Sequence, residues 1–293
     1  MNADREFTKL WNHATVDPQN LIIEVGRISQ MDRVQRAKMY ELFNRVGVVI
    51  MQHAPVSEDD PVEELIDLGK MYGKSVAHDR ADARGLVVVA EIPGKGASIA
   101  PTLMHTAGTF TPWKDVPKTV LLQCVKQSPV GGQSMIASGA LAYQYLREKE
   151  PEALKLLSNP EVFSLKRADP GKGQPGNTGA VRKAVFDHDQ LGDGRIWLSF
   201  RFDGEVKLDL FPDEAHEAYD KLFCFMNRSE NQIDFKLQPN QIMICDNTAV
   251  GHARTAYQVG SGRKLNRLQL HGGIGDCIFG FPVPEAFSKL RAA

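Results

Sequence analysis

The sequence predicts a mainly β fold with flanking helices, of the sandwich or jelly-roll type. From Leu86 to His271, short runs rich in β-branched and other apolar residues follow one another, and turn residues separate them. The chain has 293 residues, of which 42% are hydrophobic and 24% charged, as is ordinary for a globular protein with a substantial core. No internal repeat is visible, and we expect a single domain over residues 1–293.

Two helices and one strand are expected before the β-rich region. Apolar residues recur at helical intervals over residues 31–46, and Gly47 suits a left-handed helix cap. Residues 48–51 (VVIM) have the composition of a buried strand. Residues 60–63 (DPVE) combine an N-cap acid, a first-turn proline and a glutamate, which predicts a second helix ending near Tyr72.

The rest of the chain alternates predicted strands with two helices. The helices are Gly139–Lys149, preceded by the capping residue Ser138, and residues 213–227 after Pro212. A loop at residues 169–178 (DPGKGQPGNT) could form a lid over a site or merely connect two strands. The strands are expected at residues 86–92, 119–126, 133–137, 161–165, 184–187, 196–200, 233–237, 242–245 and 264–271.

Composition excludes several classes of partner. The formal net charge is −1 and no basic block is present, which argues against a nucleic-acid polymer as a partner. No apolar segment is long enough for a signal peptide or a membrane span, so we expect a cytoplasmic protein without membrane association. The sequence carries no signal of oligomeric state. The four cysteines have no metal or redox spacing and are expected to be small core residues: Cys124, Cys224, Cys245 and Cys277.

Two histidines far apart in the sequence carry the main functional signal. His105 lies in residues 104–110 (MHTAGTF), and His252 ends residues 246–252 (DNTAVGH). Non-haem Fe(II) oxygenases use two histidines and one carboxylate, and the carboxylate stands two residues after the first histidine. Ala107 occupies that place and cannot bind a metal, so iron held by the two histidines would keep one more open position. If His105 lies on a strand, residues 105 and 107 point to the same face.

The chain resembles the taurine dioxygenase (TauD/TfdA-like) family of Fe(II)/2-oxoglutarate enzymes from about Gly47 to about Gly272. Residues 105–110 (HTAGTF) are similar to the first metal motif of the family, H-x-D followed by Thr-Phe, and Asp246–Asn247 with His252 match the second. Residues 128–134 (SPVGGQS) are similar to the P-x-x-G-G-x-T stretch, whose hydroxyl binds 2-oxoglutarate. The resemblance implies a cupin-like double-stranded β-helix, a jelly roll with helices on one sheet and the metal in its open mouth.

The resemblance also implies roles for two arginines. Arg263 and Arg267 stand eleven and fifteen residues after His252, at the offsets of the family's cosubstrate and substrate arginines. A guanidinium matches a carboxylate bidentately, so Arg263 would hold the distal carboxylate of 2-oxoglutarate, with Ser134 as a second donor. Period two places Arg267 on the same strand face as Arg263, where it would meet an anionic substrate group. A buried ion pair that only stabilises the barrel is the alternative for Arg267.

Alanine at position 107 indicates the halogenase subgroup of that family, in which glycine or alanine replaces the acid and chloride coordinates the iron. The implied cofactors are Fe(II), 2-oxoglutarate, O₂ and chloride. The implied reaction couples decarboxylation of 2-oxoglutarate to chlorination of an unactivated aliphatic carbon, and substrate position decides whether chlorine or hydroxyl is transferred. Arg254, two residues after His252, could contact the substrate or the halide, and a structural role is equally compatible with its position.

Ala107 is also compatible with three alternatives to a halogenase site. The first is a hydroxylase that carries an inactivating Asp-to-Ala change. The second is a natural loss of the ligand in a metal-poor binding protein that is not an enzyme. In the third, a carboxylate from elsewhere, for example Asp115 in the following loop, replaces the missing ligand.

An arginine at position 267 favours a free, small anionic substrate over one tethered to a carrier protein. Among the free-substrate halogenases, those acting on the 2′ carbon of 2′-deoxyadenosine monophosphate in purine-antibiotic biosynthesis fit best, because a phosphate suits a basic site. Phe110 or Trp113 could stack on the adenine. A free amino acid is the second candidate.

Overall fold

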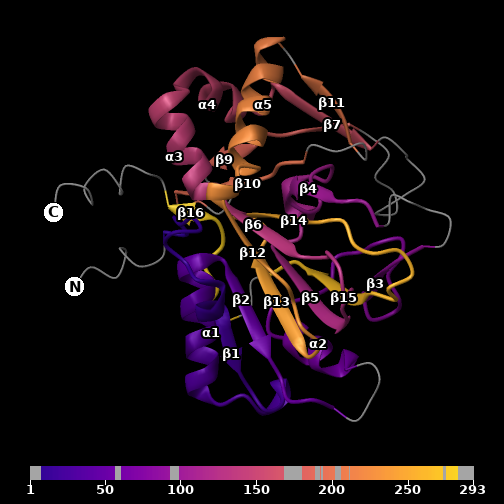
Figure 1. Cartoon of the computed structure of the whole chain (residues 1–293). Helices are drawn as coiled ribbons and strands as arrows, with labels where there is room; N and C mark the ends of the chain where they lie inside the picture. Colours follow the sequence, from indigo (N-terminus) through magenta and orange to yellow (C-terminus); the bar gives the residue numbers. More distant parts are fainter. Residues whose placement is uncertain are drawn as a thin grey trace.

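A computed structural model describes residues 8–56, 61–92, 99–167, 180–188, 192, 194–201, 206–210, 212–272 and 275–282. Two sheets from this part of the chain share one hydrophobic core and form a jelly roll (Figure 1). The larger sheet has six strands in the order β1 (Ile22–Glu24), β2 (Val48–Gln52), β13 (Gln241–Asp246), β5 (Thr119–Lys126), β15 (Lys264–Leu270) and β3 (Val87–Ala90). The smaller has four strands in the order β12 (Gln232–Phe235), β6 (Ser134–Ser138), β14 (Val250–Arg254) and β4 (Thr102–His105).

Neighbouring strands of both sheets run antiparallel, except that β1 is parallel to β2. Two three-stranded sheets accompany them. One has the order β16 (Phe281–Pro282), β10 (Arg195–Leu198) and β9 (Phe186–His188), and the other β11 (Val206–Leu210), β7 (Phe163–Arg167) and β8 (Val181–Arg182). The mainly β, jelly-roll fold expected from the sequence is confirmed.

The six-stranded sheet is covered on both faces, which explains why its central strands read as continuous apolar runs. In β2, Val48 and Ile50 join the core shared with the four-stranded sheet, whereas Val49 and Met51 face a second core. That second core lies beneath α1 (Arg33–Val46) and α2 (Val62–Gly69). Figure 1 shows α1 lying along this sheet.

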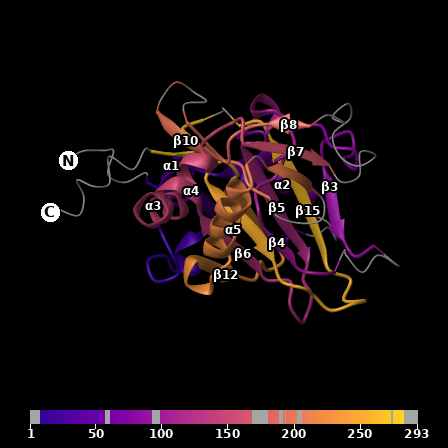
Figure 2. The same cartoon turned by 90° about the horizontal axis from the view of Figure 1, so that it is seen from above.

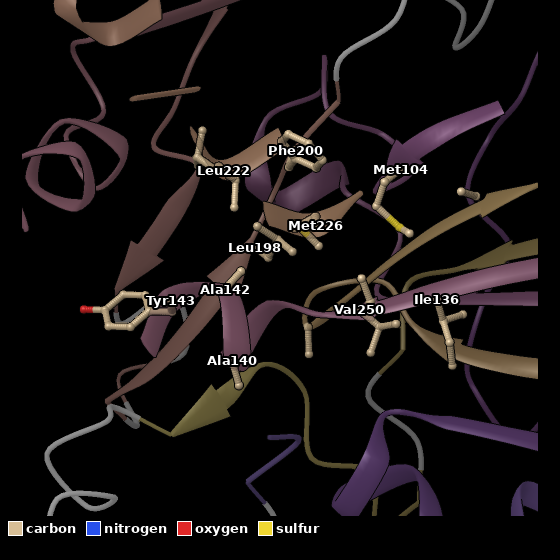
Figure 3. Packing of buried hydrophobic residues seen from close by; sticks show 14 of the residues in the cluster. Met104, Ile136, Ala140, Ala142, Tyr143, Leu198, Phe200, Leu222, Met226 and Val250 are labelled. Atoms are coloured by element: carbon tan, nitrogen blue, oxygen red, sulfur yellow. The ribbon is translucent and has the colours of Figure 1, made fainter. Parts of the chain in front are cut away.

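The remaining helices form one group. They are α3 (Gly139–Lys149), α4 (Pro151–Leu157) and α5 (Glu214–Met226), which contact one another (Figures 1 and 2). Helix α5 packs against the smaller sheet. Figure 3 shows Leu222 and Met226 of α5 in the same buried cluster as Met104 of β4, and Gly251 of β14 also packs against Met226. The outer face of the strands that carry the two histidines is therefore packed against a helix.

Local signals predicted most elements correctly. Helix α1 has a capping box between Asp32 and Gln35 and ends at Gly47, whose φ is 81°. The bounds of β5 and α3 agree with the prediction, and the Ser138 hydroxyl accepts a hydrogen bond from the Leu141 N–H as a helix cap does. Short 3₁₀ turns connect other elements: η2 (Pro18–Leu21), η3 (Ile28–Gln30), η5 (Trp113–Asp115) and η6 (Ser229–Asn231).

Several expectations were wrong in detail. Helix α2 ends at Gly69 rather than at Tyr72, and Asp60, its expected cap, lies outside the described residues, as does the loop 169–178. Neither α4, which has only seven residues, nor β1, which has three, was predicted from the sequence. Cys124 and Cys245 are buried as expected, but Cys224 is exposed on α5 and Cys277 is half-buried. None of the described helices is long and apolar enough to cross a membrane.

Candidate active site

His105 and His252 are cross-strand neighbours in the four-stranded sheet. His105 ends β4, and the antiparallel register pairs it directly with His252 of β14. Paired residues of an antiparallel sheet project from the same face, and the two ring centroids are 4.5 Å apart. On the opposite face Gly251 packs against Met104 and Met226, where an added Cβ would lie 2.7 Å from the Met226 methyl group. Packing on that face directs both imidazoles into the interior of the jelly roll.

The surroundings of both imidazoles suit the chemistry of a metal ligand. His105 Nδ1 lies 2.8 Å from the Leu103 carbonyl oxygen, so Nδ1 carries the proton and Nε2 keeps its lone pair. His252 Nδ1 is buried without a hydrogen-bond partner. Burial, followed by Arg267 and Arg201, lowers the pKa of His252 to about 3, and burial, Arg201 and His252 lower the pKa of His105 well below its usual value. Both imidazoles are thus neutral, and each has a ring nitrogen that no other group in the described chain uses. Such nitrogens suit a divalent metal ion.

The backbone at position 107 is held by Asn247, which in the sequence stands out only as part of the second metal motif. Asn247 accepts a hydrogen bond from the Ala107 N–H (2.7 Å) and donates to the carbonyl oxygens of Ala107 (2.9 Å) and Pro117 (2.7 Å). Strand β4 ends at His105, and Ala107 lies in the following turn, so the period-two argument for residues 105 and 107 does not apply. The Asn247 clamp, rather than strand geometry, sets the position of Ala107.

The structure gives no support for a replacement carboxylate. In the described part of the chain, no group of three histidine, cysteine, aspartate or glutamate side chains is arranged to hold a metal ion. Asp115, at the end of η5, therefore does not join the two histidines.

Arg263 lies just before β15 and is almost completely buried, with 2% of its surface exposed. Its guanidinium lies over the Tyr257 ring at 4.9 Å, and its Nε and Nη1 atoms have no hydrogen-bond partner. Gly132 leaves room for this guanidinium, because a Cβ at position 132 would lie only 2.9 Å from Arg263 Nε. Ser134 is buried on β6 and pairs with Arg254 of β14. A buried guanidinium with unsatisfied donors fits a ligand carboxylate.

Arg267 lies on the interior face of β15. Leu265, two residues earlier, joins the core between the main sheets, whereas Leu268 and Leu270 face the helix-covered side. Arg267 Nη2 donates to His78 Nε2 (3.2 Å), and His78 Nδ1 lies 3.0 Å from Asp79 Oδ1. His78 was not predicted from the sequence, because no motif spacing marks it.

The other predicted binding residues have different surroundings. Arg254 donates to the Ala100 carbonyl oxygen (2.6 Å) and lies over the Tyr257 ring at 4.6 Å, contacts that favour its structural role. Trp113 packs edge-to-face on Trp197 at 5.7 Å in the second core, away from the interior of the jelly roll. Phe110 is buried in the turn after His105, and a stacking role for it stays a prediction.

Comparison with known proteins identifies the family. A family model described as "Taurine catabolism dioxygenase TauD, TfdA family" matches residues 12–269 of the chain. The chain belongs to this family. Family members typically use Fe(II), 2-oxoglutarate and O₂, so the chain is a member of a family of Fe(II)/2-oxoglutarate-dependent oxidoreductases.

Three curated proteins of similar sequence have names that refer to chemically different small molecules. FR-33289 synthase of Streptomyces rubellomurinus is 26% identical over 79% of this chain and 70% of its own length. Human gamma-butyrobetaine dioxygenase is 26% identical over 82% of this chain and 59% of its own length. A uridine-5′-phosphate dioxygenase of a Streptomyces species is 25% identical over 66% of this chain and 70% of its own length.

Solved TauD-like structures share the fold. A taurine dioxygenase from Burkholderia xenovorans superposes with a TM-score of 0.61 at 16% identity and covers 86% of this chain and 88% of its own. AAD-2, in complex with Mn(II) and N-oxalylglycine, superposes with a TM-score of 0.63 at 14% identity, with coverages of 87% and 94%. These similarities confirm the jelly-roll architecture.

Proposed function

We propose that the protein is an Fe(II)/2-oxoglutarate-dependent halogenase that chlorinates an unactivated aliphatic carbon of a free, small anionic substrate in natural-product biosynthesis. The observation that supports this most strongly is the environment of Ala107. His105, two residues before it, pairs with His252 across the strands, Asn247 fixes the Ala107 backbone, and no acid among the described residues joins the histidines.

Charge balance supports an anion at this place. Fe(II) together with the chelating end of 2-oxoglutarate keeps one positive charge, which the aspartate of an H-x-D site would neutralise. An alanine leaves that charge uncompensated, and chloride restores neutrality. The overall reaction balances as substrate C–H, 2-oxoglutarate, O₂, Cl⁻ and H⁺ giving substrate C–Cl, succinate, CO₂ and water.

The residues of the chain would bind and orient the reactants. His105 and His252 would hold Fe(II), and Arg263 with Ser134 would hold the distal carboxylate of 2-oxoglutarate. The iron, when bound, supplies the activation of O₂ and the cleavage of the substrate C–H bond. Arg267 would fix an anionic group of the substrate and thereby decide which carbon lies nearest to the halide.

The surroundings of Arg267 support a phosphate as that anionic group. Arg267 Nη2 donates to His78 Nε2 at 3.2 Å, and Asp79 lies 3.0 Å from the other nitrogen of His78, so the histidine helps to orient the guanidinium. A phosphate offers several acceptor oxygens to a guanidinium that is oriented in this way. A relative named uridine-5′-phosphate dioxygenase also supports a nucleoside monophosphate. We take 2′-deoxyadenosine monophosphate as the first substrate to test and a free amino acid as the second.

The test combines the purified protein with Fe(II), 2-oxoglutarate, O₂ and chloride, and analyses candidate substrates by mass spectrometry. We expect a product in which chlorine replaces one hydrogen, with the isotope doublet of chlorine, and a bromine analogue when bromide replaces chloride. Hydroxylated product alone at high chloride would reject the halogenase. Absence of the visible charge-transfer band of Fe(II) with 2-oxoglutarate would indicate a protein that is not an enzyme of this type.

Ala107→Asp is the matched control. Because Asn247 fixes the backbone at position 107, the new carboxylate should take the place proposed for chloride. We expect the variant to lose chloride binding and chlorination while it keeps 2-oxoglutarate binding, measured by the charge-transfer band. Unchanged chlorination would mean that residue 107 does not lie at the metal.

A further inference from the structure

Arg201 completes a row of side chains that begins with the two histidines. A β-bridge pairs His105 with Arg201 in antiparallel orientation, and the register of β4 and β14 pairs His105 with His252. Directly paired residues project from the same face, with Cβ atoms about 4.5–5.5 Å apart. The order across the strands is therefore His252, His105, Arg201, and all three side chains face the interior of the jelly roll.

The segment that carries Arg201 is firmly held at this position. Tyr219 of α5 accepts a hydrogen bond from the Arg201 N–H (2.9 Å) and donates its hydroxyl proton to the Arg201 carbonyl oxygen (2.6 Å). The Thr106 N–H donates to the Phe200 carbonyl oxygen at 2.7 Å. The backbone of Arg201 is thus fixed from the helix side and from the turn that contains Ala107.

The charge of Arg201 acts on the proposed metal site. Direct pairing with His105 puts the Arg201 side chain on the same face as both imidazoles. A positive charge at this place favours an anion beside it. A cation beside the place of the missing carboxylate would therefore stabilise an anion that binds there from solution.

We propose that Arg201 is a halide-binding residue, which holds chloride or bromide next to the two histidines in the space that Ala107 leaves. This inference rests on the proposed function, because it names the residue that retains the anion used there. Its guanidinium would donate hydrogen bonds to the halide, as arginine does to other anions. It would also keep the halide on the Arg201 side of the histidine pair.

The experiment measures halide affinity without turnover. The anaerobic protein with Fe(II) and 2-oxoglutarate is titrated with chloride and then bromide, and the shift of the charge-transfer band reports the dissociation constant. We expect Arg201→Gln to weaken halide binding at least tenfold and Arg201→Lys, which keeps the charge, to weaken it less. Arg33→Gln, which removes an exposed arginine at the start of α1, is the matched control and should leave the affinity unchanged.

A second readout separates halide binding from a structural role. 2-Oxoglutarate affinity and the thermal midpoint without halide should be the same in both Arg201 variants and the wild type. Chloride should raise the midpoint less in Arg201→Gln than in the wild type, because a ligand stabilises a protein according to its affinity.

The ways in which this proposal can fail are distinguishable. Wild-type halide affinity retained in Arg201→Gln would overturn the role of Arg201 and leave the halogenase proposal standing. A wild-type protein that binds no halide would reject both. If Arg201→Gln loses 2-oxoglutarate binding or folding, and Arg201→Lys loses as much as Arg201→Gln in every measurement, the residue is structural and the proposal is wrong.

Discussion

Lys9 and Arg263 are both buried cations, but only Lys9 pairs with an acidic side chain of the described residues. Lys9 is fully buried and pairs with the Asp246 carboxylate, and its Nζ also donates to the Ile278 carbonyl oxygen at 2.6 Å. Arg263 is 2% exposed, stacks on Tyr257, and has two nitrogens without a partner. No acidic side chain in the described ranges pairs with it.

The difference separates a charge that the fold itself compensates from one that fits the proposed ligand role. A buried charge is costly unless an opposite charge and hydrogen bonds compensate for it. Asp246 compensates Lys9 within the chain, and it also accepts hydrogen bonds from the N–H and hydroxyl of Thr248, so the pair stabilises the loop before His252. Arg263 lacks such compensation, and a carboxylate from outside can supply it.

The largest expected effect comes from Lys9→Met. Removal of the ammonium leaves the Asp246 carboxylate buried and unpaired, which should lower the free energy of unfolding by about 3–5 kcal/mol. Urea denaturation of the metal-free protein measures this. Lys70→Met, which removes an exposed pair with Asp67, is the control and should leave the free energy of unfolding almost unchanged. If Lys9→Met and the wild type were equally stable, the Lys9–Asp246 pair would not be a structural charge pair.

Arg263→Gln should lower the affinity for 2-oxoglutarate rather than the stability of the fold. Because no carboxylate of the described residues depends on Arg263, the free energy of unfolding of the metal-free protein should change little or rise. Affinity for 2-oxoglutarate should fall by about 2–4 kcal/mol, roughly 30- to 1,000-fold, measured by titration of the anaerobic Fe(II) protein. Ser134→Ala, which removes one neutral donor, should cost only about 1 kcal/mol of binding free energy. A loss of stability without a loss of affinity would contradict the ligand role.

Lys183 is a third buried cation, and it sharpens the comparison because its effect on stability should depend on pH and be small at pH 7. Its Nζ donates to the Thr111 carbonyl oxygen at 3.0 Å and lies over the Trp113 ring, and burial lowers its pKa to about 7. Above pH 7 the unfolded chain, with an ordinary lysine pKa, binds more protons than the folded protein, so stability rises with pH up to about 10.5. Lys183→Met should remove that rise.

The measurement for Lys183 is the difference between wild-type and Lys183→Met unfolding free energies from pH 6 to pH 10. The wild type should gain on the variant by at most about 1.4 kcal/mol per pH unit above pH 7. A difference that does not change with pH would mean that Lys183 stays protonated in the fold.

Much of the fold could be predicted because its signals are local. The cap of α1 at Gly47, the Ser138 cap of α3 and the apolar run of β5 each act over a few residues, and each was found at the expected place. Helix α4 was missed because seven residues directly after α3 give too few helical turns for a periodic pattern. The same limit applies to the three residues of β1.

The sequence by itself determined the chemical elements of the candidate site: two histidines, an alanine where the family motif has an aspartate, and arginines at offsets from His252 that match the family. Only the tertiary structure decided their geometry. The register of β14 on β4 brings the imidazoles together, the Asn247 clamp sets Ala107, and the β-bridge to His105 places Arg201. These contacts join residues about a hundred or more positions apart, and pairing at that range depends on how sheets pack rather than on any neighbouring residue.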